Sequence, residues 1–277
     1  MLLLLPRDPL APRRADEHFA PEAAAAAELG LPTALVDHDE LTATEPDPAR
    51  AVRGVPADAD AVYRGWMLRS EQYAAMAGAL AARGVRLRTS PEQYRAAHEL
   101  PGWYAALSDV TPESRWDTDG DVGWLGSGAA VLRDHTKSLK HAWSEACLVP
   151  DVTDAAAAQR VVARFRELRG EDLVGSVVVR RFEEFIGPEA RTWWVGGRCV
   201  LVTAHPDTPD ELPADPDLEL AAPAVATLGL PFVTVDLVRR ADGRWRVVEL
   251  GDGQVSDRPS TTPPVELLTA LAAGGAA

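Results

Sequence analysis

The sequence has little cysteine, little lysine and no long apolar run. The two cysteines among its 277 residues, Cys147 and Cys199, cannot supply a framework of disulfide bridges or a zinc cluster, so we expect a reducing, cytoplasmic environment. The apolar run at residues 2–5 has no basic segment before it and is cut short by residues 6–8, Pro-Arg-Asp. No segment approaches the ~20 apolar residues of a membrane span, so we interpret residues 2–5 as a buried strand and expect no membrane contact.

Positive charge is also scarce, because 28 basic side chains stand against 42 acidic ones and the formal net charge is -14 at pH 7. Such a surface repels phosphate backbones and anionic membranes, which argues against a protein that coats nucleic acid. A nucleotide can still bind where a local cluster of positive charge and a divalent metal offset its phosphates. We therefore expect no nucleic-acid partner and leave nucleotide binding open.

Only two of the 28 basic residues are lysines, Lys137 and Lys140, and they lie three residues apart. A GC-rich coding bias explains the preference for arginine, and it makes two clustered lysines a candidate site where a compact ammonium group is needed. Together with Arg133 they follow a glycine loop at residues 126–128, so they could hold phosphates. The same spacing also fits an ordinary exposed basic helix face, and chance clustering is the other alternative.

The length predicts two or three units rather than one. Strand-like runs and helical segments alternate over about the first 100 residues, and this β-α-β rhythm is typical of a parallel sheet covered by helices. Two Gly-containing turns, at residues 196–197 and 242–243, indicate antiparallel hairpins in the second half. We therefore expect an α/β domain at residues 1–108 followed by an α+β region at residues 109–277.

The last hairpin carries the strongest chemical signal. If residues 242–243 form a two-residue turn, Asp236 and Glu249 lie six residues from it on either side and are direct cross-strand neighbours. Two adjacent carboxylates repel each other unless a cation lies between them or one is protonated. Oxygen ligands of this kind suit Mg²⁺, and Asp252 follows close behind. The alternative is an exposed acidic hairpin in an acidic protein.

Two more acidic residues, Glu183 and Glu184, follow a strand expected at residues 173–180. A carboxylate at such a strand exit can accept both ribose hydroxyls, and the adjacent backbone can recognise the edge of adenine. Arg191 follows at the start of the first hairpin. A solvated loop would explain the same acidic residues.

The order of these features resembles that of the ATP-grasp superfamily, specifically its little-characterised bacterial and phage members with short stand-alone chains. The resemblance covers essentially the whole chain. It is found in three stretches, residues 63–68 (YRGWML), 134–141 (DHTKSLKH) and 247–256 (VVELGDGQVS). It implies a preceding parallel-sheet domain and two α+β subdomains that close on ATP and Mg²⁺.

The resemblance also implies roles for individual residues. Arg133, Lys137 and Lys140 would contact phosphates, Glu183 or Glu184 the adenine and ribose, and Arg191 the phosphoryl region, while Asp236 and Glu249 would bind Mg²⁺. The sequence departs from the family pattern at Arg133, where a lysine is common, and at Gly251, where an Asn ligand is usual. Asp252 is the hypothetical replacement for that ligand.

Most ATP-grasp enzymes join a carboxylate to an amine through an acyl phosphate, so the resemblance implies a ligase acting on small-molecule or peptide substrates. Arg64, at a strand end, could orient the substrate carboxylate. A nucleotide-binding module without turnover is the first alternative, favoured by Arg133 and Gly251. A nucleotidyl-transferring ligase with Lys137 as nucleophile is a weaker one, because no Lys-x-Asp-Gly arrangement occurs. The sequence leaves the oligomeric state open.

Overall fold

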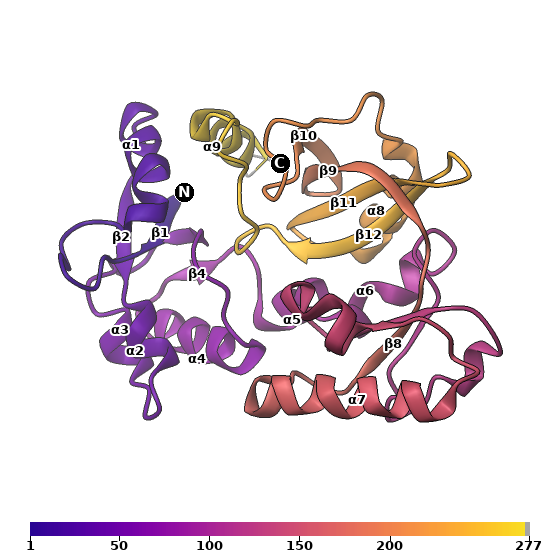
Figure 1. Cartoon of the computed structure of the whole chain (residues 1–277). Helices are drawn as coiled ribbons and strands as arrows, with labels where there is room; N and C mark the ends of the chain where they lie inside the picture. Colours follow the sequence, from indigo (N-terminus) through magenta and orange to yellow (C-terminus); the bar gives the residue numbers. More distant parts are fainter. Residues whose placement is uncertain (275–277) are drawn as a thin grey trace.

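The computed structural model describes residues 1–274, and it contains three four-stranded sheets. Figure 1 shows the N-terminal sheet on the left, the C-terminal sheet at upper right, and the middle unit with its long helix α7 at lower right. No helix within residues 1–274 combines the length and the apolar character needed to cross a membrane.

The first sheet is parallel, with strand order β2-β1-β3-β4, as the sequence predicts. Its strands are β1 (Leu2–Pro6), β2 (Thr33–Val36), β3 (Asp60–Tyr63) and β4 (Arg86–Leu87). Every residue of β1 is buried, because Leu2 and Leu4 pack on one side of the sheet and Leu3 and Leu5 on the other. A central strand covered on both faces explains the continuous apolar run.

The helices of this unit differ in detail from the sequence prediction. They are α1 (Ala20–Glu28), α2 (His38–Thr42), α3 (Pro48–Ala51), α4 (Ser70–Ala81), α5 (Pro91–His98) and α6 (Leu100–Leu107). The two short helices α2 and α3 lie in a segment that was predicted to be a variable connection, and α5 and α6 were not predicted. Ser70 is the first residue of α4 rather than its N-cap, which is Arg69.

The middle unit is an antiparallel sheet with order β5-β8-β6-β7, covered by α7. Its elements are β5 (Ser114–Arg115), β6 (Ala130–Arg133), β7 (Leu148–Val149), β8 (Val178–Arg181) and α7 (Ala155–Arg169). The N-cap of α7 is Asp154 and not Thr153, as expected from the sequence. Strand β8 begins later than predicted, because Gly175 has a φ of +68°, which a continuous strand cannot adopt.

The third sheet is antiparallel, with order β10-β9-β11-β12. Its strands are β9 (Phe185–Val195), β10 (Arg198–Ala204), β11 (Phe232–Arg240) and β12 (Trp245–Asp252), and two helices, α8 (Ala222–Leu228) and α9 (Pro264–Ala273), complete the fold. One face packs on α6 and α8. On the other, Trp193 and Phe232 are covered by α9, and alternation along the same strands places Arg191 and Asp236 on this face too.

Asp236 and Glu249 are cross-strand partners, as predicted, although the hairpin differs from the predicted one. The loop has three residues, closed by the bond from the Arg240 N–H to the Arg244 carbonyl, with Gly243 at a φ of +86°. This longer loop shifts the register by one residue. A β-bulge at Val248 shifts it back before Asp236 is reached.

Two helices cross the division expected between residues 1–108 and 109–277. Trp103 of α6 belongs to the core under the C-terminal sheet, and Leu268 of α9 packs beside Leu3 in the N-terminal sheet. The sheets themselves fall on the expected sides of the division. The domain boundary stays a prediction.

Candidate active site

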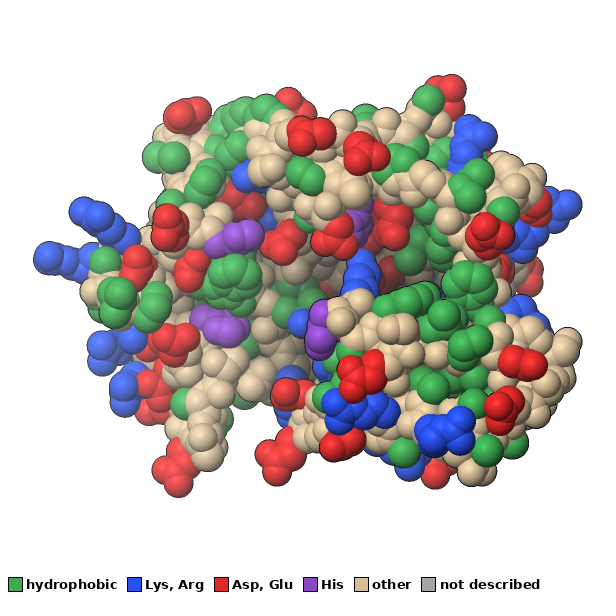
Figure 2. All heavy atoms as spheres, viewed as in Figure 1, with side chains coloured by type: hydrophobic (Ala, Val, Ile, Leu, Met, Phe, Trp, Pro, Cys, Tyr) green, Lys and Arg blue, Asp and Glu red, His purple; other side chains and the backbone are tan. Residues whose placement is uncertain are grey.

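A pocket of about 420 Å³ lies where the middle unit meets the C-terminal sheet. Figure 2 shows the surface hollowed at the centre of this view, with acidic side chains gathered above the hollow and a basic one across it. Among the residues lining it are six that the sequence singled out: Lys137, Lys140, Arg191, Asp236, Glu249 and Asp252. The chain thus brings together groups separated by more than 100 residues.

The lysine segment is folded by Asp134, which follows β6 and is fully buried. Its Oδ1 accepts from the N–H groups of Thr136 and Lys137, each at 2.7 Å, and its Oδ2 pairs with Arg169. Burial by itself raises the pKa of Asp134, but these backbone donors and Arg169 lower it overall. The resulting tight turn, closed by the bond from the Asp134 N–H to the Lys137 carbonyl at 2.9 Å, fixes where Lys137 leaves the backbone.

The two lysines have different surroundings. Lys140 Nζ lies 2.9 Å from the Asp207 carboxylate, and both side chains are largely exposed. Within residues 1–274 the Lys137 ammonium makes no such ion pair, although it lines the same pocket. Lys137 is therefore the cation of this pocket that is ready to accept a new anionic partner.

Arg191 and Asp236 form a bidentate pair on neighbouring strands. The Arg191 Nε and Nη2 donate to the two Asp236 oxygens at 2.9 and 2.8 Å. Burial alone lowers the pKa of Arg191, but the Asp236 carboxylate raises it overall, so the guanidinium stays charged. Both side chains line the pocket, where Arg191 also donates to the Asp257 carbonyl at 2.9 Å.

Glu249 is paired with Arg133, whose Nη2 lies 2.7 Å from Glu249 Oε1. Arg133 is buried at the end of β6 and also donates to the Thr136 carbonyl at 3.0 Å. The pair therefore links the middle unit to the C-terminal sheet directly under the lysine turn. Arg133 does not line the pocket, so a direct phosphate contact from it stays a prediction.

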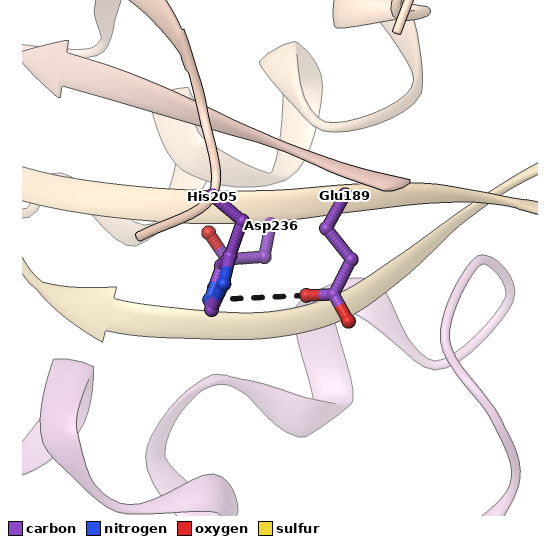
Figure 3. A group of neighbouring side chains, drawn as sticks. All are labelled: Glu189, His205 and Asp236. Carbon is purple, nitrogen blue, oxygen red and sulfur yellow. Dashed lines mark ion pairs between the residues drawn. The ribbon is translucent and has the colours of Figure 1, made fainter. Parts of the chain in front are cut away.

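Two residues that sequence reasoning did not select lie beside Asp236. Figure 3 shows Glu189 and His205 pointing toward it, and their ligand atoms lie within 4.8 Å of one another. His205 Nε2 is 3.7 Å from Asp236 Oδ2 and 3.9 Å from Glu189 Oε2. Burial first and Asp236 second raise the pKa of Glu189 to about 7, while burial lowers that of His205. A set of nitrogen and oxygen donors of this kind could hold a cation.

Glu189 has the strand parity of Arg191, which was a usable signal for it. His205 could not be found by counting from the turn at residues 196–197, because a bulge between Cys199 and Leu201 shifts the register. A direct count places Ala204 opposite Glu189, whereas the structure places His205 there, with its N–H on the Glu189 carbonyl at 3.1 Å.

Arg64 is a correction to the sequence prediction. Its side chain is 1% exposed and is held by Glu22 at 2.7 Å and by the carbonyls of Gly253, Gln254 and Ser256. With every direction of the guanidinium fork occupied by the protein, it cannot orient a substrate carboxylate. It instead fastens the N-terminal sheet to the loop after β12.

Glu183 and Glu184 are not brought to the pocket. Glu183 accepts two bonds from Arg246, at 2.6 and 2.7 Å, and Arg240 lies 3.6 Å away. Glu184 is exposed, and its carbonyl accepts from Ala241. The structure thus commits Glu183 to ion pairs within the sheet, and an adenine or ribose contact from either residue stays a prediction.

Asp252 lines the pocket but is buried, and it is three residues from Glu249, so it starts from the opposite face of β12. Its Oδ1 accepts from the N–H and the side-chain amide of Gln254 at 2.9 and 3.1 Å. Burial raises the pKa of Asp252 to about 7. A role as metal ligand beside Glu249 stays a prediction.

A family model described as an ATP-grasp domain, the third family of its clade, matches residues 121–271, more than half of the chain. The chain belongs to this ATP-grasp family. The match includes the lysine turn, the two hairpins and the acidic pair, so the resemblance and the mixed fold expected from the sequence are confirmed.

Solved ATP-grasp structures cover nearly the whole chain. The RimK domain protein ATP-grasp from Sphaerobacter thermophilus DSM 20745 is 20% identical with a TM-score of 0.68, covering 99% of this chain and 98% of its own. D-cycloserine synthetase DcsG is 18% identical with a TM-score of 0.61, covering 99% of each chain. Macrocyclase MdnC bound with precursor peptide MdnA, from Microcystis aeruginosa MRC, is 13% identical with a TM-score of 0.58, covering 100% of each. At these identities the likeness shows a common fold. No curated protein matches the sequence.

Proposed function

We propose that this ATP-grasp protein is an ATP- and Mg²⁺-dependent ligase that joins a carboxylate to an amine or similar nucleophile through an acyl phosphate. The observation that best supports this is the pocket itself. It gathers the Lys137 and Lys140 ammonium groups on one wall and the Asp236 and Glu249 carboxylates on another. This is the charge arrangement that a metal-bound triphosphate requires.

The donor set fits a hard dication. Asp236 and Glu249 are direct cross-strand neighbours that line one pocket, and Glu189 adds a carboxylate beside Asp236. We propose that Asp236 and Glu249 hold Mg²⁺, with Asp252 or Glu189 as the further oxygen donor. The ion would bridge phosphate oxygens and neutralise their charge during transfer.

In the proposed reaction, a carboxylate oxygen attacks the γ-phosphorus of ATP, the bond from that phosphorus to the β,γ-bridging oxygen breaks, and ADP leaves. The amine nitrogen then attacks the acyl carbon, the C–O bond to phosphate breaks, and the nitrogen loses a proton. Lys137 and Lys140 would bind the transferred and leaving phosphates. Arg191, fixed by Asp236, would face the phosphoryl group.

Names of structural neighbours support a ligase and suggest peptides among its substrates. The ATP-grasp ligase PsnB was solved with a precursor peptide and AMPPNP, and with Mg and ADP. MdnC is a macrocyclase bound with its precursor peptide, whereas DcsG is a synthetase of D-cycloserine. Both peptide and small-molecule carboxylates are therefore proposed as substrates of this protein.

A nucleotide-binding module without turnover is the second candidate. It is favoured by the Arg133–Glu249 ion pair, which occupies one of the proposed metal ligands, and by Gly251 in place of an amide side chain. Under this proposal ATP and Mg²⁺ bind, but no ADP is released when carboxylates and amines are added.

The test is a thermal-unfolding comparison of the wild type and Glu249→Gln, with the non-hydrolysable analogue AMPPNP and with or without Mg²⁺. The Gln side chain retains an acceptor for Arg133 but removes the charge. At ligand about 100-fold above its Kd, binding stabilises by about 2.7 kcal/mol, a shift of roughly 5–10 °C.

We expect a Mg²⁺-dependent shift in the wild type that is lost in Glu249→Gln. The exposed Glu219, which lies outside the pocket, provides the matched control Glu219→Gln, which should behave like the wild type. An equal shift in all three proteins would contradict the metal site. Mg²⁺-dependent binding without ADP release on addition of carboxylates and amines would favour the module.

A further inference from the structure

A second pocket, of about 800 Å³, adjoins the first on the side of the N-terminal unit. The two pockets share Met67, His98, Thr136 and Lys137. One wall of the second pocket is the segment that leads from β3 into α4, and the opposite wall is the 3-10 turn Gly170–Asp172 that follows α7. A molecule in this pocket therefore lies next to Lys137, at the phosphate end of the proposed nucleotide site.

The second pocket is lined by charged side chains, most of which are already paired. Arg69 Nη2 lies 2.7 Å from Asp172 Oδ1 and 3.0 Å from the Glu171 carbonyl, which bridges the two walls. Arg169 is bound by Asp134 and by the Asp172 carbonyl. Both guanidinium groups are thus committed to the protein.

Two charged groups of this pocket form no ion pair within the described residues. One is the Lys137 ammonium at the junction with the first pocket. The other is the carboxylate of Glu171, an exposed residue that lines the second pocket alone. A ligand that satisfies both must carry a negative group toward the junction and a positive group away from it.

On the basis of the proposed function, we infer that the second pocket binds the carboxylate substrate, and that this substrate is a dipolar amino acid or short peptide. Its carboxylate meets Lys137, where the γ-phosphoryl group is transferred, and its ammonium group meets Glu171. The volume lies within the usual range of ligand pockets, which suits a molecule of this size. Hydroxyl and amide side chains on the N-terminal wall, such as Thr44 and Gln72, suit a polar backbone.

Calorimetric titration of the full chain, saturated with AMPPNP and Mg²⁺, tests this with three probes: trialanine, trialanine amide and N-acetyl-trialanine. We expect trialanine to bind, the amide to bind about tenfold more weakly and the acetylated peptide about fivefold more weakly, because each modification removes one charge. Glu171→Gln should weaken trialanine binding about fivefold and make it insensitive to acetylation. Glu219→Gln is the control and should behave like the wild type.

The inference is overturned if no probe binds at about 10 mM. It is also overturned if acetylation has the same effect on the wild type and on Glu171→Gln, because the ammonium group then does not meet Glu171. If the Mg²⁺-dependent nucleotide shift persists while the peptides fail to bind, only this inference is lost. Absence of the nucleotide shift itself would remove the proposed function as well.

Discussion

Replacing Arg64 should destabilise the protein strongly, and this separates an anchoring role from the catalytic role that its position in the sequence suggested. The guanidinium makes five hydrogen bonds, two to Glu22 and one each to three carbonyls of the loop after β12. Arg64→Met would leave the Glu22 carboxylate, which is 4% exposed, buried without a partner. Breaking a buried pair in this way costs about 3–5 kcal/mol.

For a chain of this length such a loss lowers the midpoint of thermal unfolding by about 10 °C. The double variant Arg64→Met with Glu22→Leu should recover about 1–3 kcal/mol, because the stranded charge is gone. Arg198, an exposed residue of β10, provides the control Arg198→Met, which should change stability by less than about 0.5 kcal/mol. Differential scanning calorimetry measures all of these. If Arg64→Met unfolded within about 2 °C of the wild type, the anchoring role would be refuted.

Three further predictions concern pH, the hairpin and the lysine pair. Burial lowers the pKa of His98 from 6.5 to about 4, so the unfolded chain takes up the proton first as pH falls. Between about pH 6.5 and 4 this costs on the order of 3 kcal/mol, and His98→Phe should lose that much less stability over this range in urea titrations. Gly243→Ala, at a φ of +86°, should cost about 1 kcal/mol by the same measurement, whereas Gly54→Ala, which has open space and no positive φ, should not; equal effects would contradict the turn assignment. Lys140→Ala breaks an exposed pair with Asp207 and should change stability by under about 1 kcal/mol while weakening AMPPNP binding in calorimetry; unchanged binding would exclude Lys140 from the phosphate site.

Alternation and turn signals predicted much of the fold, because they are local. The parallel order of the first sheet and both hairpins follow from such patterns. The pairing of Asp236 with Glu249 was predicted correctly by a count that ignored two irregularities, a three-residue loop and the bulge at Val248. These cancel, and Arg180 stabilises the bulge by donating to the Val248 carbonyl at 2.9 Å.

Long-range partners were not predictable from local patterns. Arg64 occupies a strand end, which is typical of substrate-binding residues, but its anchor residues lie 42 positions before it and about 190 after it. His205 escaped notice because one inserted residue in β10 moved the register. The helices α5 and α6 have short apolar stretches whose partners are on the C-terminal sheet, so no local segment marks them as core elements.

The packing of α9 has a consequence for how the protein is made. The side of the first sheet that holds Leu3, Leu5 and Phe19 is completed by Leu268, one of the last helical residues to leave the ribosome. The earliest part of the chain therefore remains without part of its apolar cover through most of translation. We expect nascent chains arrested before residue 264 to be cleaved readily by added protease, and completed chains to resist it.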